Sequence, residues 1–369
     1  MLSVLSAICV FVVSTAAQKT GVCDQTRECM RYSFQPGERA LCLGYYGCKA
    51  AEFHVDDKVI CSGMKACFRA KYAGDQALIM CNGLSACERA RSITGASTGL
   101  VATEKIVCNG LKACNAVVGG LNAPRVQCDG DLTCTNIVSK TAVLQYGLNI
   151  NGDSEVYCNG HGACKQAQIR SNDLVYCDGD GGCLETRIIA PTISCQGKRV
   201  CKDSFLSGQT IMAYGFFGAA NTTVYPQDLT QHFTVKAYGF NSLVLATVET
   251  RGAPATLEAY GYRAMAGSTF YCGPNSDCNV ICKSNACRGL RVDYAKNANL
   301  RMDPPECMVD SPPRKIRGVH CPQVCKAGVC LTSLTEQEIA DQAQFVYEMA
   351  EMDMVFDREF NAYIEEKLS

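Results

Sequence analysis

The sequence is poor in several residue types, and each shortage argues against a class of function. Its 369 residues include no Trp and only 4 His, and charged residues make up 19%. The formal net charge is −1, so no bulk positive field favours binding to nucleic acid or to an anionic membrane surface. After the first residues no stretch reaches 18 apolar residues, so we expect no transmembrane segment there.

Catalytic motifs are also missing from the sequence. The four histidines, His54, His161, His232 and His320, are scattered and show neither HExxH nor triad spacing. Ordinary surface or turn positions explain them better than a catalytic role. The glycines stand singly rather than in a phosphate-binding loop, so the sequence predicts no enzyme active site and no cofactor.

Cysteine, in contrast, is abundant. The chain has 27 Cys, far more than a reducing compartment tolerates without metal binding. Residues 1–17, MLSVLSAICVFVVSTAA, are predicted to be a signal peptide, although they contain no Lys or Arg; the alternative is a short buried strand. Their removal takes away Cys9 and leaves 26 Cys, an even number that indicates a fully paired, secreted, extracellular protein.

Most cysteines belong to one repeated motif, in which Cys-x-Gly is followed by three residues and a second Cys. Examples are CSGMKAC at 61–67, CNGLSAC at 81–87 and CNGLKAC at 108–114. Successive copies start 18–30 residues apart, mostly 18–20, which is typical of a solenoid. We define the first Cys of each copy as the reference position, which is occupied by Cys42, Cys61, Cys81, Cys108, Cys128, Cys158, Cys177 and Cys195.

The columns around the reference position indicate a strand that enters a corner. Residues such as Val59 and Ile79 stand two positions before it and favour a strand with one inward face. A glycine stands two positions after it in every copy, which indicates a backbone angle that other residues resist. The pattern continues without cysteine in AYGFFGA at 213–219, AYGFNSL at 237–243 and AYGYRAM at 259–265, so disulfides are not its cause.

These columns predict an all-β fold, a right-handed parallel β-solenoid of about 12 coils of about 20 residues over residues 41–300. The corner brings cysteines six residues apart close together, whereas stacked cysteines of neighbouring coils have parallel Cβ vectors. We therefore expect each bridge to lie within one coil. The predicted pairs are Cys42–Cys48, Cys61–Cys67, Cys81–Cys87, Cys108–Cys114, Cys128–Cys134, Cys158–Cys164, Cys177–Cys183, Cys195–Cys201, Cys272–Cys278 and Cys282–Cys287.

Both ends of the solenoid differ from its body. Residues 18–40, with CDQTREC at 23–29, lack the motif's glycine and are predicted to be an N-terminal cap that covers strand edges. Residues 301–332 are predicted to be a cysteine- and proline-rich cap. A zinc site is the alternative there, but the spacings fit no ribbon or finger. Two further bridges are expected among Cys307, Cys321, Cys325 and Cys330.

The last segment, residues 333–369, is predicted to be an acidic amphipathic α-helix. Thr335 and Glu338 form a capping box, and ten Asp and Glu against Arg358 and Lys367 give the segment a charge of −8, which leaves about +7 on the rest. Two alternatives stay open: the helix covers its own solenoid, or it docks on a partner or on another copy. The apolar residues at helical spacing are Ile339, Ala343, Val346, Met349, Phe356, Phe360 and Ile364.

One column is a candidate ligand site. The residues directly after the reference position are mostly Asn or Asp in the cysteine coils and become Tyr214, Tyr238 and Tyr260 further on. The structural interpretation is a ladder that supports turns and stacking. The functional interpretation is a stripe that faces a glycan or a mineral, with Asp129 and Asp178 as weak Ca²⁺ ligands. The sequences around them match neither an EF-hand nor a nonapeptide calcium repeat, so no metal site is predicted.

Other functions of β-solenoids need patterns that are weak in this sequence. Polysaccharide lyases and hydrolases need clustered carboxylates, whereas Asp129 and Asp178 are separated by the coil that contains Asn159. Ice binding needs a flat, regular threonine ladder, which the aligned repeats do not reveal. Asn221 begins an Asn-Thr-Thr triplet and is a predicted N-glycosylation site in a secreted protein.

The C-x-G-x-x-[AG]-C unit resembles repeats in uncharacterised secreted proteins of protists and algae, which are predicted to be cysteine-rich right-handed parallel β-helices. The resemblance covers residues 40–292, and the cysteine-free coils and the acidic tail depart from it. It implies the fold and an extracellular compartment, and it brings no established activity.

The repeat and the missing catalytic motifs together predict a secreted, non-enzymatic structural or interaction module of the cell surface, the extracellular matrix or surface filaments. The alternative is a carbohydrate-binding or polysaccharide-active β-helix protein. We expect protein or glycan partners outside the cell, or self-association, and no nucleic-acid partner.

Overall fold

The structure, a computed structural model, describes most of the repeat region. The described residues are 19–73, 76–93, 100–118, 120–135, 149–261, 263–283, 286–287, 290–295, 297–303 and 317–318. The predicted signal peptide, the four cysteines after Asp303 and the predicted C-terminal helix lie outside the described residues. The described part contains no helix with the length and apolar character that a membrane crossing requires.

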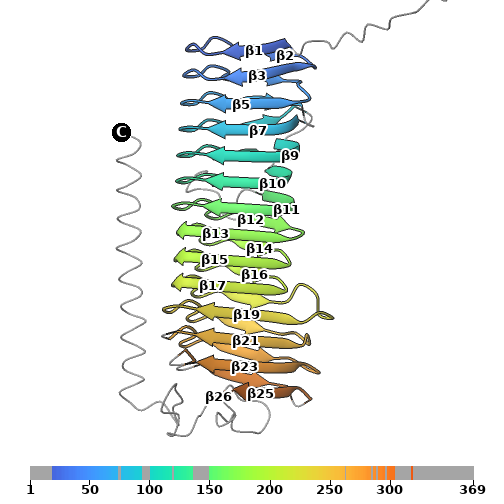
Figure 1. The fold of residues 1–369 in the computed structure, drawn as a ribbon, viewed down its shortest axis with the longest axis vertical. Coiled ribbons are helices and arrows are strands. Elements are labelled where there is room, and N and C mark those ends of the chain that lie inside the picture. The colour runs from blue at the N-terminus through green and yellow to red at the C-terminus, as the bar shows by residue number, and fades with distance from the viewer. Residues whose placement is uncertain are drawn as a thin grey trace, which may run out of the picture.

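The described chain is a parallel β-solenoid of about 13 turns of about 20 residues, which forms a straight rod (Figure 1). Each turn adds one strand to a long face, where it pairs in parallel with the equivalent strand of the next turn. The strands of this face are β1 (Lys19–Cys23), β3 (Glu38–Cys42), β5 (Lys58–Ser62), β7 (Gln76–Asn82), β9 (Leu100–Asn109), β10 (Leu121–Asp129), β11 (Asn149–Asn159), β13 (Leu174–Asp180), β15 (Thr192–Lys198), β17 (Thr210–Phe216), β19 (Phe233–Tyr238), β21 (Ala255–Tyr260), β23 (Asp277–Lys283) and β25 (Asn299–Asp303).

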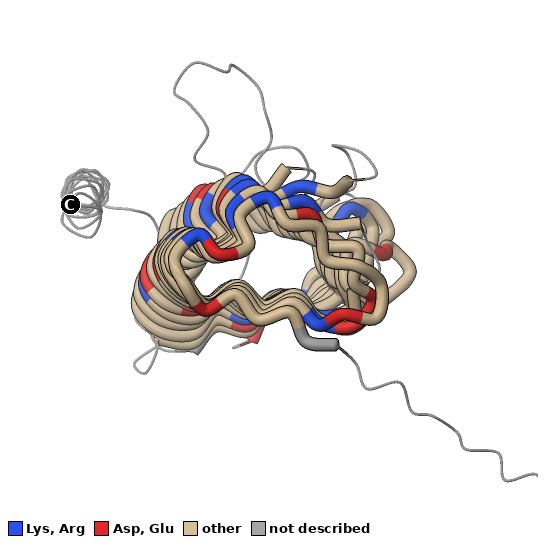
Figure 2. Tube along the Cα trace, turned by 90° about the horizontal axis from the view of Figure 1, so that it is seen from above, with Lys and Arg blue, Asp and Glu red and all other residues tan. Residues whose placement is uncertain are grey.

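A second, shorter set of strands begins about ten residues after most reference positions, although none is described after Cys108 or Cys128, and β26 is added at the C-terminal end. These strands also stack in parallel, apart from the last, which is antiparallel to β24. They are β2 (Ser33–Phe34), β4 (Glu52–Phe53), β6 (Lys71–Tyr72), β8 (Arg91–Ser92), β12 (Gln168–Ser171), β14 (Arg187–Ile189), β16 (Phe205–Ser207), β18 (Thr223–Tyr225), β20 (Thr247–Glu249), β22 (Thr269–Cys272), β24 (Arg291–Tyr294) and β26 (Arg317–Gly318). Seen along the rod, the turns superimpose as rings (Figure 2).

The rod has one turn more than the sequence indicated. β1 pairs with β3 so that Cys23 aligns with Cys42, and Cys23 is bridged to Cys29. Residues expected to be only a cap therefore contain a turn of the solenoid. The missing glycine has a physical reason: in later turns the glycine is needed because its Cβ would meet the backbone of the preceding turn, and no described turn precedes this one.

The core follows the alternation of each strand. In β19, Phe233, Val235 and Ala237 are buried, whereas the residues between them are half-buried. The reference column and the column two positions before it both point inward, so every turn contributes a small residue or Cys and an apolar residue to a thin core. This arrangement explains why cysteine, alanine and β-branched residues dominate the repeat.

Eleven disulfides lie within the described residues; ten of them close the corner after a reference position, and Cys272–Cys278 closes the corner between β22 and β23. The partners are six residues apart, except for Cys282 and Cys287, which are five apart. Ala213, Ala237 and Ala259 continue the same column between Cys195 and Cys282. The turn geometry is therefore independent of the disulfide.

The turn after each reference position uses left-handed backbone conformations. In the third turn, Gly63 has φ 129°, and Lys65 and Arg69 have φ 54° and 57°. These conformations direct N–H groups to the next turn: Lys65 N donates to Leu84 O at 2.8 Å, and Arg69 N donates to Glu88 O at 3.0 Å. Hydrogen bonds thus join the stacked turns as well as the strands.

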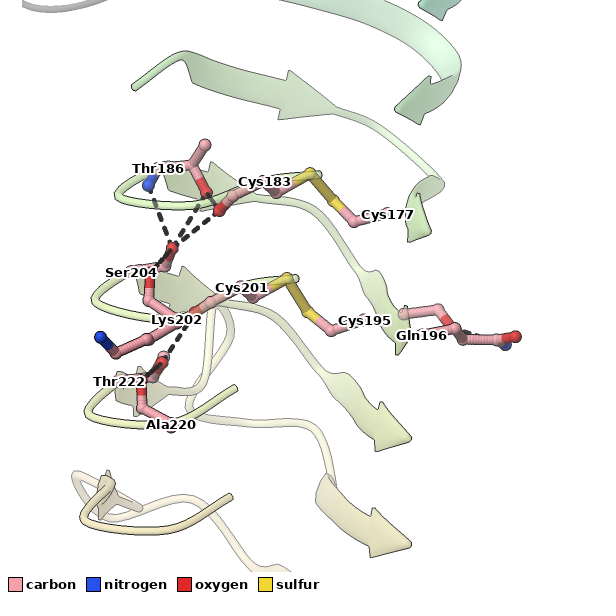
Figure 3. The surroundings of a disulfide bond; sticks show 11 residues. Cys177, Cys183, Thr186, Cys195, Gln196, Cys201, Lys202, Ser204, Ala220 and Thr222 are labelled. Carbon is pink, nitrogen blue, oxygen red and sulfur yellow. Dashed lines mark hydrogen bonds between the residues drawn. A yellow bond between two sulfur atoms is a disulfide. The ribbon is translucent and has the colours of Figure 1, made fainter. Parts of the chain in front are cut away.

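Buried hydroxyl groups complete the turns in the middle of the rod (Figure 3). Thr186 Oγ1 and Ser204 Oγ donate to Cys183 O at 2.7 and 3.0 Å, and Thr222 Oγ1 donates to Cys201 O at 2.9 Å. Ala51, Ala70, Ala90 and Ala167 occupy this column in four of the earlier turns. The later turns therefore satisfy carbonyl oxygens of bridged cysteines with side chains, as buried polar groups require.

Candidate functional site

The predicted ligand stripe lies on the outward side of the long face. Asp129, Asn159 and Asp178 align on β10, β11 and β13, and the row continues through Gln196 to the tyrosines. Two strand spacings separate Asp129 from Asp178, about 10 Å. Sequence alignment alone therefore predicted this row correctly, because each side chain sits at one fixed position of the repeat.

The polar part of the stripe is held by its own hydrogen bonds. Asp129 accepts from Asn159 Nδ2 at 3.0 Å and also from the Gln127 amide. Asp178 accepts from Gly179 N at 2.6 Å, and the Tyr176 hydroxyl donates to Gln196 Oε1 at 3.1 Å. Burial is the main reason that the pKa of Tyr176 is raised, and the neighbouring Asp178 carboxylate raises it further. The carboxylates of Asp129 and Asp178 thus accept hydrogen bonds from neighbouring groups of the same stripe.

The tyrosine part of the stripe is a stack of three rings, with one ring on each of three successive turns. The Tyr214 and Tyr238 centroids are 5.1 Å apart with planes 10° apart, and those of Tyr238 and Tyr260 are 4.9 Å and 3° apart. All three side chains are half-buried. The ring faces cover one another, so the surface offers ring edges and hydroxyl groups rather than the flat faces that a sugar would stack on.

Charged neighbours fix the middle of this stack. Lys236 and Glu258 form an ion pair of 3.2 Å beside it, and the Tyr238 hydroxyl donates to Glu258 at 3.2 Å. The hydrogen bond to Glu258 raises the pKa of Lys236, and burial is the main reason that the pKa of Tyr238 is raised. At neutral pH, Tyr238 therefore stays a neutral donor.

We predict that Tyr238→Ala destabilises the protein by about 0.5–1.5 kcal/mol more than Tyr214→Ala. Tyr238 loses two ring stacks, whereas Tyr214 loses one, and each stack contributes about 0.5–1.5 kcal/mol beyond area burial. Denaturant unfolding with intact disulfides measures both losses. A glycan platform would instead show weakened glycan binding by both variants without a change in the unfolding midpoint.

A second row beside the stripe was missed by the sequence analysis. Asp131, His161 and Asp180 follow the glycines of three successive turns, and their backbones stack: Leu132 N donates to His161 O at 2.9 Å and Gly162 N to Asp180 O at 3.0 Å. The equivalence is visible when DGD at 129–131, NGH at 159–161 and DGD at 178–180 are aligned, whereas the four histidines by themselves show no pattern.

The electrostatics of this row place an imidazole between carboxylates. Burial lowers the pKa of His161, and the carboxylates of Asp180 and Asp131 oppose that shift. Lys198 Nζ lies 3.9 Å from Asp180 Oδ2 at the end of the row. At neutral pH the imidazole is uncharged, so His161 is a base between two carboxylic acid side chains. All three side chains of the row are half-buried.

Metal-binding geometry does not involve these carboxylates. Within the described ranges, the sets of three potential ligand atoms close enough to share an ion consist of cysteines alone, for example Cys158, Cys177 and Cys183. These cysteines are disulfide-bonded and offer no thiolate. The weak Ca²⁺ interpretation of Asp129 and Asp178 gains no support from their distances.

The structure also reveals a threonine row that the repeat alignment did not reveal. Thr192, Thr210, Thr234 and Thr256 are in register on β15, β17, β19 and β21. The neighbouring outward column holds a mixture at the same level, Ser194, Met212, Lys236 and Glu258. The row is therefore a single column beside charged residues, and it does not form the flat surface that ice binding needs.

The predicted glycosylation site lies on an exposed turn. Asn221 has φ 51°, and its Nδ2 donates to Asp203 Oδ1 at 2.6 Å. The next residue, Thr222, is buried and bonded to backbone carbonyls. Attachment of a glycan to Asn221 stays a prediction, and in this position a glycan would replace a contact between turns.

The comparisons with known proteins identify no relative of this chain. The resemblance to repeat proteins of protists and algae therefore stays a prediction. The structure itself shows that the chain is a cysteine-rich parallel β-solenoid. Protein-family models, curated proteins and solved structures were all compared with the chain, and none of them matches it.

Proposed function

We propose that this protein is a secreted, non-enzymatic structural or interaction module of the cell surface, the extracellular matrix or surface filaments. The observation that carries the proposal is the covalent closure of single corners: each described bridge joins cysteines five or six residues apart, and the reference cysteines of successive turns are paired in register. Such a rod resists local opening, and its many disulfides favour an oxidising, extracellular environment.

The chemistry of the long face supports this proposal. The carboxylates of Asp129 and Asp178 accept hydrogen bonds from neighbouring amides, and the tyrosine rings are stacked on one another. The Asn159–Asp129 hydrogen bond and the tyrosine stack join adjacent turns, which is the role expected of ladders in a structural solenoid. A rigid rod of about 60 Å then presents repeated surface groups at strand spacing to partners.

Negative-stain images of the mature protein, combined with light scattering over a range of concentrations, test the proposal. We expect separate rods of about 60 Å or end-to-end filaments built from them. Surface biotinylation of intact cells of the source organism should label the protein, or it should be found in the medium. Recovery from the cytosol with free thiols would contradict the proposal.

The alternative is a carbohydrate-binding or polysaccharide-active protein, and the Asp131–His161–Asp180 row is the observation that favours it. A base between two carboxylates is the type of group that acid–base chemistry needs. We expect no turnover of pectins, alginates or β-glucans. Cleavage that is lost in His161→Ala, or in Asp129→Asn with Asp178→Asn, while unfolding is unchanged, would establish the alternative.

A further inference from the structure

Basic and aromatic side chains gather at the corners of the first three turns. Backbone hydrogen bonds stack these corners, since Arg27 N donates to Tyr45 O at 3.1 Å and Tyr46 N donates to Met64 O at 3.2 Å. We define the basic corner patch by six side chains, all of them exposed or half-buried: Arg27, Tyr46, Lys49, Lys65, Phe68 and Arg69. The patch extends over two strand spacings along the rod, about 10 Å.

Cations and rings alternate within the patch. Lys49 Nζ lies 4.4 Å from the centroid of the Tyr46 ring, and Lys65 Nζ lies 5.6 Å from the same centroid. Both ammonium groups lie 5.9 Å from the centroid of the Phe68 ring, and the Arg69 guanidinium lies 5.2 Å from it. Ring faces attract these cations and hold them in place, but a neutral ring does not cancel their charge.

The positive charge of the patch is not compensated by acids. Residues 45–50 and 64–69 contain three cations and neither Asp nor Glu. Among the described residues, no carboxylate lies at ion-pair distance from Lys49, Lys65 or Arg69. The ion pairs of these turns involve other cations: Arg39 with Asp57, Lys71 with Glu52 and Arg89 with Glu88. The three patch cations therefore remain able to pair with an anionic ligand.

Exposed apolar side chains border the patch. Of the nine large apolar side chains that are exposed among the described residues, six lie between Val22 and Met64. Tyr45 is 41% exposed, and its ring contacts the Tyr46 ring edge-on, with 4.4 Å between the centroids. Met64 precedes Lys65 and is 45% exposed. The surface thus combines uncompensated cations with apolar area, which suits a ligand that has acid groups on a carbon skeleton.

We propose that the basic corner patch binds an acidic polysaccharide, a partner class for the extracellular interaction role proposed above, on which this inference rests. Its sulfate or carboxylate groups pair with the ammonium and guanidinium groups, and a sugar ring packs on Tyr45. Successive sugar rings of an extended chain follow one another at a distance comparable with the strand spacing of about 5 Å. Anionic lipids are concentrated in the cytoplasmic leaflet, so outside the cell an acidic polysaccharide is the better match.

Titration calorimetry of the full-length, oxidised protein tests the proposal with two probes, oligosaccharides of a sulfated galactan and of alginate. At low ionic strength we expect binding of at least one probe, and this binding should weaken as salt is added because the charges are exposed. Lys49→Gln with Lys65→Gln should weaken it at least about tenfold. Tyr45→Ala should weaken it about two- to tenfold, because the ring contact with the sugar is lost.

Lys112→Gln with Lys165→Gln is the matched control. Lys112 and Lys165 stand four and seven residues after Cys108 and Cys158, the positions that Lys65 and Lys49 occupy in their own turns. The control pair removes the same charge from the same positions of the repeat, outside the patch, and its affinity should equal that of the wild type. Unchanged unfolding midpoints in all variants separate lost binding from misfolding.

Failure of both oligosaccharides to bind, or an equal loss of affinity in the two lysine pairs, would overturn the proposal. Tighter binding of polyglutamate or of phosphatidylserine vesicles than of either oligosaccharide would overturn it in favour of an acidic protein or a membrane. The proposed extracellular role fails on a different result, recovery of the protein from the cytosol with free thiols, so the two failures are distinguishable.

Discussion

Gly197→Ala is expected to destabilise the protein by about 3–5 kcal/mol, because it combines backbone strain with overpacking. Gly197 has φ 116°, and a Cβ there would lie 2.4 Å from the carbonyl oxygen of Gly179 in the preceding turn. The next glycine of the column, Gly215, makes the same approach to Gly197 O. The clash cannot be relieved locally, since the backbones of three turns are stacked at this point.

Gly252→Ala is the control for this prediction. Gly252 has a similar φ of 106°, but the nearest atom to its Cβ would be Pro274 O at 3.4 Å. It should therefore lose only the strain of a left-handed residue, about 1–2 kcal/mol. Denaturant unfolding of both variants with intact disulfides separates the two effects. Equal losses would show that conformation, and not the contact between turns, selects glycine in this column.

Reduction of the disulfides is expected to prevent the chain from refolding. A bridge between cysteines six residues apart contributes about 2 kcal/mol in the loop-entropy picture. Eleven such bridges together exceed the stability of about 5–15 kcal/mol that is typical of a domain. The cysteine-free turns between Ala213 and Met265 should unfold as well, since each turn of a solenoid depends on its neighbours.

Circular dichroism of the reduced and alkylated chain after dilution from denaturant measures this outcome. The expected spectrum lacks β structure and shows no cooperative thermal transition. A single bridge should matter far less: Cys195→Ala with Cys201→Ala reproduces the Ala213 and Ala219 pair of the next turn, and we expect it to fold with a loss of about 2 kcal/mol. A cooperative transition in the fully alkylated chain would contradict the expected role of the bridges.

The register of the rod was predictable because a solenoid is nearly one-dimensional. Each residue of the long face contacts its equivalent one turn away, so aligning the repeats is equivalent to pairing the strands. Cys81 opposite Cys108 and Asp178 opposite Gln196 follow from that alignment alone. Cysteine pairing was predictable for a similar reason, since the corner places residues six apart at bridging distance.

The first turn and the threonine row were less visible in the sequence. Cys23 begins a turn without glycine, because the steric demand on glycine comes from the preceding turn. Thr192, Thr210, Thr234 and Thr256 lie outside the motif that defined the alignment. In both cases the local pattern was incomplete, and only the paired strands show the equivalence.

Amino-acid order therefore determined the solenoid, its strand register and its bridges, because these depend on contacts between equivalent positions. Tertiary structure decided which neighbouring columns meet. It turned three tyrosines into a closed stack, placed His161 between Asp131 and Asp180, and buried Asn241 and Val244 at the tips of the turns. These properties depend on side-chain direction and on packing between neighbouring columns. A repeat pattern predicts which positions of successive turns are equivalent, but it does not predict which side chains of different columns touch.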